Sequence, residues 1–291
     1  MPEVVPRLKD QLPARPRAWL HAGHKWVMRN DHVRSALFDV QDGLDWLLDR
    51  RNPLVPPRKL VHGIGSSLGV GETYLRHFRE LAQLQPTEAV LDVGCGIGRM
   101  ALPLTRYLLP PGRYEGFDIL RANVAWCRQA ITPRFPNFRF QHADVFNREY
   151  NRRGRLAGDQ FRFPYPDGAF DFAFLTSVFT HLMPADAAHY LSELGRVLRP
   201  GGRCLATFFL MNAESEGLVT AGHGHIRFQP FAGPAWVSNP TIPEACLALD
   251  ESFVIEAAAK GGLSINQSCP GSWCGRGTST DFQDIVVFGK T

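Results

Sequence analysis

The chain has 291 residues, of which 44% are hydrophobic and 21% are charged. This supplies enough apolar material for a sizeable core, so the composition excludes a largely disordered protein. No run of about 18 apolar residues predicts a membrane-spanning helix, and residues 1–20 lack the apolar stretch of a secretory signal, so we expect a cytoplasmic protein. Six cysteines without a CxxC pair indicate free thiols, several of them buried, rather than a disulfide framework or a zinc ribbon.

The formal net charge of +4 is confined to the start of the chain. Residues 1–60 hold eleven basic and seven acidic side chains, whereas residues 61–291 hold 21 of each. A balanced remainder argues against a general affinity for nucleic acid. We expect residues 1–60 to form an N-terminal arm and an amphipathic helix that cap the site, followed by one catalytic domain over residues 61–291.

Residues 1–60 contain two kinds of pattern. Four prolines predict an irregular arm over residues 1–30. From Asp31 to Leu47, apolar residues recur every three or four positions, which predicts an amphipathic helix with Asp31 as its cap and Pro53 beyond its end. A loop rich in glycine and proline follows as far as Gly71, and the spacing of apolar residues over 75–84 predicts another helix.

Beyond Pro86, short apolar runs alternate with helical patterns. Parallel strands need crossovers and nearly continuous apolar strands need cover on both faces, so the pattern predicts an α/β fold. We expect a Rossmann-like, doubly wound, mostly parallel seven-stranded sheet with helices on both faces. Residues 210–248 show no stable period and are expected to form a lid or acceptor-binding insert after the fifth strand. The expected strands span residues 89–93, 114–118, 138–142, 170–175, 204–209, 263–267 and 284–288, and the expected helices span residues 98–109, 119–131, 185–198 and 250–260.

The segment Val90–Arg99, VLDVGCGIGR, joins a strand to a helix through three closely spaced glycines. These glycines allow a tight turn and let a ligand lie directly against the backbone. The dinucleotide fingerprint is GxGxxG, whereas here the third glycine comes one residue early and Arg99 stands at the usual position. Asp92 before the glycines also suits a cation or a hydroxyl donor better than a diphosphate. A dinucleotide oxidoreductase is therefore the less favoured interpretation.

This segment resembles the first motif of the class I S-adenosylmethionine-dependent methyltransferases, and the resemblance extends from about Thr87 to Phe209. It implies S-adenosyl-L-methionine as cofactor and S-adenosyl-L-homocysteine as product. In that family the acid at Asp92 lies near the cofactor's ammonium group, the acid at Asp118 accepts both ribose hydroxyls, and the acid at Asp144 accepts the adenine amino group. The cofactor site implied by the resemblance comprises Asp92, Gly94, Cys95, Gly96, Gly98, Arg99, Asp118, Ile119, Asp144, Val145 and Thr176.

A sulfonium methyl group is a strong electrophile, so the protein mainly has to align the reactants and exclude water. An oxygen or nitrogen acceptor still profits from a general base, and histidine is the usual one. His181, after the fourth strand, resembles a histidine of many small-molecule methyltransferases and is the catalytic candidate, although it also suits a structural role in its loop. His223 and His225 are rival bases. Their spacing also fits a metal, but no acid or cysteine cluster completes a ligand set, so we expect no metal.

The absence of several known motifs from the sequence narrows the range of possible methyl acceptors. The fourth strand is not followed by the Asn/Asp-Pro-Pro-aromatic motif of base-nitrogen methylation or by the aspartate that holds magnesium in catechol methylation. A Pro-Cys pair and a paired-glutamate loop are missing as well. We therefore expect direct in-line transfer to the oxygen or nitrogen of a small organic or lipid acceptor, and not to nucleic acid.

Two features and three alternatives stay open. Arginines between Arg148 and Arg162 suit either a solvated loop or an anion site, and the aromatics Phe228, Phe231, Trp236 and Trp273 suit either core or pocket walls. The alternative functions are a catalytically silent protein that binds the cofactor or a partner, an RNA methyltransferase and an NAD(P)-dependent oxidoreductase.

Overall fold

The computed structural model describes residues 31–48, 52–61 and 69–291, and it divides the chain into two compact units, Met1–Ser66 and Ser67–Thr291. The arm expected over residues 1–30 lies outside the described residues. In the first unit, helix α2 spans Asp31–Leu47, as predicted, and a short helix α3 spans Arg58–Val61 within the predicted loop. Arg58 donates to Asp42 and Asp45, each at 2.6 Å, so ion pairs join the two helices.

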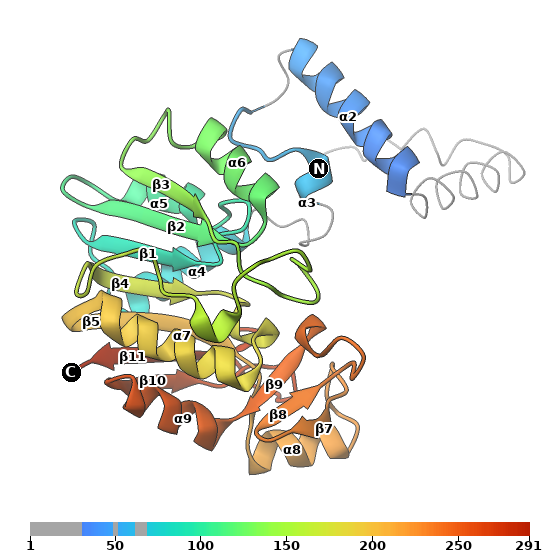
Figure 1. Cartoon of the computed structure of the whole chain (residues 1–291), viewed down its shortest axis with the longest axis vertical. Coiled ribbons are helices and arrows are strands. Elements are labelled where there is room, and N and C mark those ends of the chain that lie inside the picture. The colour runs from blue at the N-terminus through green and yellow to red at the C-terminus, as the bar shows by residue number, and fades with distance from the viewer. Residues whose placement is uncertain (1–30, 49–51, 62–68) are drawn as a thin grey trace, which may run out of the picture. The chain divides into compact units, whose positions relative to one another are not determined.

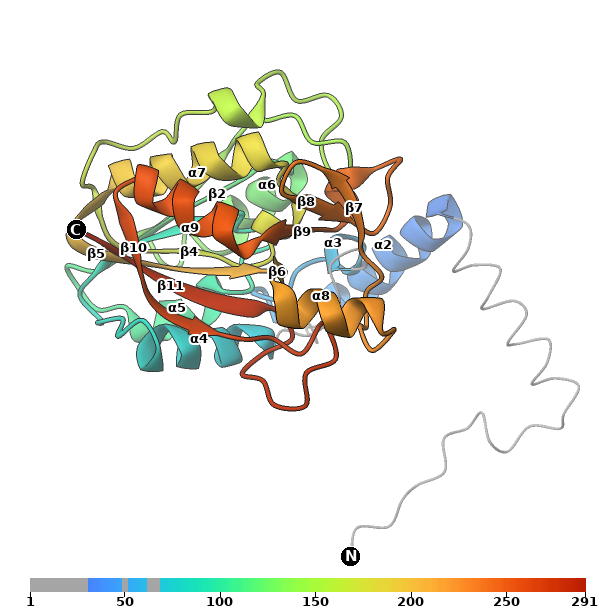
Figure 2. The same cartoon turned by 90° about the horizontal axis from the view of Figure 1, so that it is seen from below.

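A seven-stranded sheet forms the centre of the second unit, in the order β10-β11-β5-β4-β1-β2-β3. Neighbouring strands are parallel, except that β11 is antiparallel to both β5 and β10. Helices α7 and α9 cover one face and α4 and α5 the other (Figures 1 and 2). The predicted fold class is confirmed. The strands are β1 (Ala89–Val93), β2 (Arg113–Asp118), β3 (Phe138–His142), β4 (Phe170–Leu175), β5 (Leu198–Phe208), β10 (Leu263–Cys269) and β11 (Asp284–Lys290).

The helices of this unit follow the predicted apolar spacing with small shifts at their ends, except that α4 begins at Val70, within the predicted loop, and ends at Glu80 instead of residue 84. All five residues of β1 are buried, as expected for a strand covered on both faces. Pro184 occupies the first turn of α7, where the missing N–H of proline costs no hydrogen bond. The helices are α4 (Val70–Glu80), α5 (Ala101–Tyr107), α6 (Arg121–Ala130), α7 (Pro184–Val197) and α9 (Glu251–Lys260).

Strand β5 begins at Leu198, ahead of the strand expected over residues 204–209, and it includes Pro200-Gly201-Gly202. The register against β4 passes from Phe170 opposite Leu198 to Phe172 opposite Arg203 with an irregularity between the two pairs. Gly201 has a φ of 75°, a conformation that side chains disfavour. The segment is therefore an irregular stretch of the strand rather than a turn ahead of it.

The prediction that residues 210–248 lack regular structure is wrong. They contribute most of a second sheet with the order β6-β9-β8-β7, next to helix α8 (Figure 1). Strands this short cannot display a period, which is why the pattern was missed. A capping box between Asn212 and Ser215 starts the helix. The elements are β6 (Leu210–Met211), α8 (Ala213–Thr220), β7 (Gln229–Ala232), β8 (Ala235–Val237), the 3-10 turn η4 (Pro243–Ala245) and β9 (Leu247–Asp250).

The aromatic residues left open between core and pocket fall into both environments. Trp273 and Phe228 are buried in a small core with Phe209. Trp236 is half-buried and donates its Nε1–H to Asp250 at 2.9 Å, whereas Phe231 is exposed. All six cysteines are free, as predicted, and four of them are buried. Across residues 31–48, 52–61 and 69–291, no helix is long and apolar enough to cross a membrane.

Candidate functional site

The glycine loop follows β1 and turns on three left-handed residues, Gly94, Gly96 and Gly98, with φ of 81°, 51° and 74°. A Cβ at Gly94 would lie 2.5 Å from Val178 Cγ2, and one at Gly98 would lie 2.8 Å from Ile131 Cδ1. At Gly96, by contrast, a Cβ would meet no described atom within 4 Å. Two of the glycines are thus required by packing, whereas Gly96 exposes bare backbone to a space in which a ligand fits.

Asp92 lies on β1 directly below this loop and is 1% exposed. The Tyr114 hydroxyl donates to its Oδ2 at 2.5 Å, while its Oδ1 has no hydrogen-bond partner among the described residues. Burial raises the pKa of Asp92 to about 8, and the Tyr114 hydrogen bond opposes that rise. A buried carboxyl oxygen is normally paired, so this one fits a ligand that brings an ammonium or hydroxyl donor.

Asp118, at the end of β2, fastens the glycine loop. Its Oδ2 accepts the Gly96 N–H at 2.8 Å and its Oδ1 accepts the Leu120 N–H at 2.7 Å. Burial raises the pKa of this carboxyl group, and the two amide donors counteract the rise. Each carboxylate oxygen accepts more than one hydrogen bond, so two ligand hydroxyls can still be held here. Ile119 beside it is half-buried against the core.

Asp144 lies two residues beyond the end of β3 and is paired within the protein. Its Oδ2 accepts from Arg155 Nε at 2.5 Å, and this hydrogen bond keeps the pKa of Asp144 below its usual range. The main-chain amides of Arg155 and Leu156 also donate to the Asp144 carbonyl. Neither interpretation of the arginines between Arg148 and Arg162 included this pairing, because composition does not show which residue a loop folds back onto. Val145, next in the chain, is buried.

The remaining cofactor candidates occupy the same edge of the sheet. Cys95 is buried, which raises the pKa of its thiol, so the side chain is neutral. Arg99 is half-buried. Burial lowers the pKa of its guanidinium, and electrostatic interaction with Tyr74 and Asp92 opposes that decrease. Thr176 is half-buried immediately after β4, before Ser177 with its positive φ of 57°.

His181 ends the 3-10 turn η3 (Phe179–His181). Its Nδ1 lies 2.8 Å from the Glu244 carbonyl oxygen, so Nδ1 carries the proton and Nε2 the lone pair. Nε2 lies 3.3 Å from the Tyr150 hydroxyl, which sequence reasoning did not single out. Burial lowers the pKa of His181, and the Glu244 carbonyl and the Glu149 charge counteract this, so the ring is neutral at pH 7. The turn starts beside Val178, which packs against Gly94.

The rival histidines lie elsewhere. His223 and His225 are exposed in the segment between α8 and β7, and the His225 N–H donates to the Trp273 carbonyl at 2.9 Å. In the described part of the chain, no group of three or more His, Cys, Asp and Glu residues is arranged to hold a metal ion.

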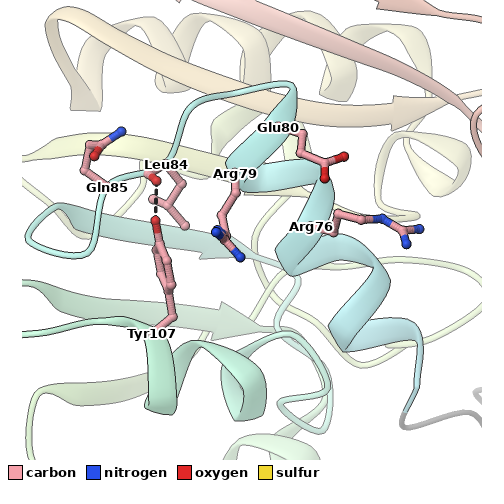
Figure 3. A pocket seen from close by; sticks show the side chains of 6 residues that line it. All are labelled: Arg76, Arg79, Glu80, Leu84, Gln85 and Tyr107. Carbon is pink, nitrogen blue, oxygen red and sulfur yellow. Dashed lines mark hydrogen bonds between the residues drawn. The ribbon is translucent and has the colours of Figure 1, made fainter.

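A separate hollow lies between α4 and α5 (Figure 3). The Tyr107 hydroxyl donates to the Leu84 carbonyl there, and the Arg79 guanidinium lies 5.6 Å from the centre of the Tyr107 ring. The hollow shares no residue with the glycine loop or with the His181 turn. Its lining consists of Arg76, Arg79, Glu80, Leu84, Gln85 and Tyr107.

The sheet order and the glycine loop with its acids define a class I S-adenosylmethionine-dependent methyltransferase domain. Residues 91–206 match the family described as Methyltransferase domain, and the chain thus contains a domain of this family. The fold is also that of an S-adenosylmethionine-dependent methyltransferase from Mesorhizobium loti, with a TM-score of 0.51, 13% identity and coverage of 77% of this chain and 100% of that one.

Curated relatives are similar over parts of their length. A demethylmenaquinone methyltransferase of Deinococcus radiodurans is 31% identical over 60% of this chain and 65% of its own. A fatty-acid O-methyltransferase of Mycolicibacterium smegmatis is 35% identical over 40% of this chain and 36% of its own. The chain spans about half the length of the curated relatives it matches.

Proposed function

We propose that this protein transfers a methyl group from S-adenosyl-L-methionine to an oxygen or nitrogen of a small organic or lipid acceptor, leaving S-adenosyl-L-homocysteine. The observations that carry the proposal are the open backbone face of Gly96, whose N–H donates to the Asp118 carboxylate, and Oδ1 of Asp92, which has no hydrogen-bond partner among the described residues. The relatives named for demethylmenaquinone and fatty acids support a small, apolar acceptor.

Each residue of the site has a role in this proposal. When bound, S-adenosyl-L-methionine supplies an electrophilic methyl group. Asp92 holds the ammonium group through Oδ1, Asp118 holds the ribose hydroxyls, and Asp144 with Val145 contacts the adenine. His181 takes the acceptor's proton on Nε2, because Nδ1 is already engaged as a donor. The other candidates, Gly94, Cys95, Gly98, Arg99, Ile119 and Thr176, shape the walls.

Calorimetric titration with S-adenosyl-L-homocysteine tests the cofactor site. Wild-type protein is expected to bind and Asp118→Ala to bind at least tenfold more weakly, because both the loop anchor and the ribose contact are lost. No binding by wild type, or binding of NADPH in its place, would refute the proposal. Cofactor binding without methylation of a wide acceptor panel would favour the catalytically silent alternative, and methylation of RNA would favour the nucleic-acid alternative.

Two further statements belong to the proposal. We propose that the protein is cytoplasmic, which cell fractionation tests. We also propose that residues 1–60 act as a cap; deleting them should then change acceptor turnover more than cofactor affinity, whereas unchanged acceptor kinetics would remove that role.

A further inference from the structure

A polar cluster beside His181 has no role in the cofactor site. It joins three segments distant in sequence: Tyr150 in the loop after β3, His181 after β4 and Glu244 in η4. The Tyr150 and His181 rings meet edge to face, with centres 5.0 Å apart. Asn147, at the start of the loop that carries Tyr150, donates its Nδ2–H to the His181 carbonyl at 3.1 Å. The contacts therefore fix both rings relative to each other.

The hydrogen-bond directions in this cluster are determined by its chemistry. The Glu244 carbonyl only accepts, so His181 Nδ1 donates to it, and Nε2 is left to accept from the Tyr150 hydroxyl. Tyr150 is 43% exposed, so part of its side chain is accessible from solvent. Partial burial and the charge of Glu149 raise the pKa of Tyr150, which keeps its proton in place at neutral pH.

Glu244 contributes a carboxyl group as well as the carbonyl that His181 contacts. Its side chain is buried, with the residue 7% exposed, yet Oε2 has no hydrogen-bond partner among the described residues. Arg148 lies close to the other oxygen, with its Nε 3.7 Å from Oε1. A buried carboxylate oxygen without a donor disfavours a second carboxylate close to it.

The loop that carries Tyr150 also has an apolar surface. Phe146, Tyr150 and Leu156 are each more than 40% exposed, and the Phe146 N–H donates to the Leu156 carbonyl at 2.8 Å, which places these two residues side by side. Exposed apolar side chains beside a polar cluster fit a ligand with an apolar body and one polar group.

We infer that Tyr150, His181 and Glu244 form an acceptor site for a neutral hydroxyl of the phenol or quinol class, and that Tyr150 relays the acceptor's proton to His181. The inference rests on the proposed function. The acceptor's hydroxyl proton passes to the Tyr150 oxygen as the Tyr150 proton passes to His181 Nε2. The acceptor oxygen bonds to the methyl carbon, and the electron pair of the broken carbon–sulfur bond stays on sulfur. Tyr150 ends neutral and His181 ends as the imidazolium, which then releases the proton to water.

A pair of probes with one ring system tests the acceptor class. We expect 1-naphthol to bind the protein saturated with S-adenosyl-L-homocysteine at least tenfold more tightly than 1-naphthoate at pH 7. Tyr150→Phe should reduce that preference below threefold, and Glu244→Gln should strengthen naphthoate binding. Tyr165→Phe is the matched control, because the buried Tyr165 hydroxyl has no partner among the described residues. Equal or tighter naphthoate binding, no binding of either probe, or an unchanged preference in Tyr150→Phe would overturn the inference.

Nuclear magnetic resonance of 15N-labelled histidine tests the relay without an acceptor. The Tyr150 hydroxyl stabilises the neutral ring by donating to Nε2, so Tyr150→Phe should raise the pKa of His181, with the Glu149 charge and the Glu244 carbonyl still present to favour the cation. An unchanged pKa, or a proton on Nε2 in wild type, would overturn the relay. Loss of cofactor binding in the wild-type titration would instead mark failure of the proposed function, because this resonance measurement requires no cofactor.

Discussion

Replacing Gly96 with alanine tests whether this glycine is needed for ligand contact or for packing within the glycine loop. At a φ of 51° an alanine costs about 1–2 kcal/mol, of which about 0.4–1 kcal/mol is offset by reduced freedom of the unfolded chain. The new methyl group meets no described atom within 4 Å, so no clash adds to this cost. The melting temperature of Gly96→Ala should therefore fall by only a few degrees, since about 1 kcal/mol corresponds to roughly 2–4 °C in a domain of this size.

The same methyl group occupies the space assigned to the cofactor. If overpacking by this methyl group destabilises the complex by about 1–3 kcal/mol, affinity for S-adenosyl-L-homocysteine falls by about 5- to 150-fold. Gly98→Ala is the matched control, because its φ of 74° imposes similar strain while its Cβ would lie 2.8 Å from Ile131 Cδ1. That variant should lose about 1–3 kcal/mol more stability and less affinity. Wild-type affinity in Gly96→Ala, measured by calorimetry below its melting temperature, would refute the assignment of this space.

Three further predictions concern buried carboxyl groups. Because the pKa of Asp92 is raised to about 8, the folded protein holds a proton between about pH 4 and 8 that the unfolded chain has released, so stability falls as pH rises through that window. Urea unfolding of Asp92→Asn should lack this slope and show a gain on the order of 4 kcal/mol at pH 7; a slope equal to that of wild type would contradict the burial argument. Binding of a cation beside Asp92 should release a proton at pH 7, seen as a calorimetric enthalpy that varies with the buffer's ionisation enthalpy, and independence from buffer would argue against that contact. Asp284 accepts from the Leu210 and Gly271 amides, Trp273 Nε1 and Arg276, so Asp284→Ala should cost about 3–5 kcal/mol in chemical unfolding, and a loss under 1 kcal/mol would show that the network contributes little.

Local sequence determined much of the central sheet. β1, β3 and β4 begin and end at the predicted residues, because four of the five residues of β1 are apolar, β3 alternates Phe138 and Phe140 with polar residues, and β4 ends in four consecutive apolar residues. The glycine loop was equally visible, because a strand followed by glycines at alternate positions permits few backbone paths. The small sheet after β5 was missed, since its strands of two to four residues are stabilised by pairing with one another and not by a local pattern.

Tertiary structure alone decided what each side chain of the site contacts. Sequence placed three acids at strand ends without distinguishing them. Packing then left one Asp92 oxygen without a partner in the described part of the chain, joined Asp118 to two amides and paired Asp144 with Arg155. Similarly, all three glycines of the loop have positive φ, but they differ in the space around them. Val178 lies against one and Ile131 against another, whereas the third faces space that no described residue fills.

The His181 cluster shows the same division between local and long-range information. Sequence indicated a histidine after the fourth strand, but its tautomer depends on the carbonyl of Glu244, 63 residues away, and its Nε2 on Tyr150, 31 residues before it. Such contacts arise when the ends of β3 and β4 and the small sheet converge, and no local pattern specifies a pairing made across folded segments. Residue types therefore identified the chemistry available to this protein, and the packing of distant segments decided which atoms can carry it out.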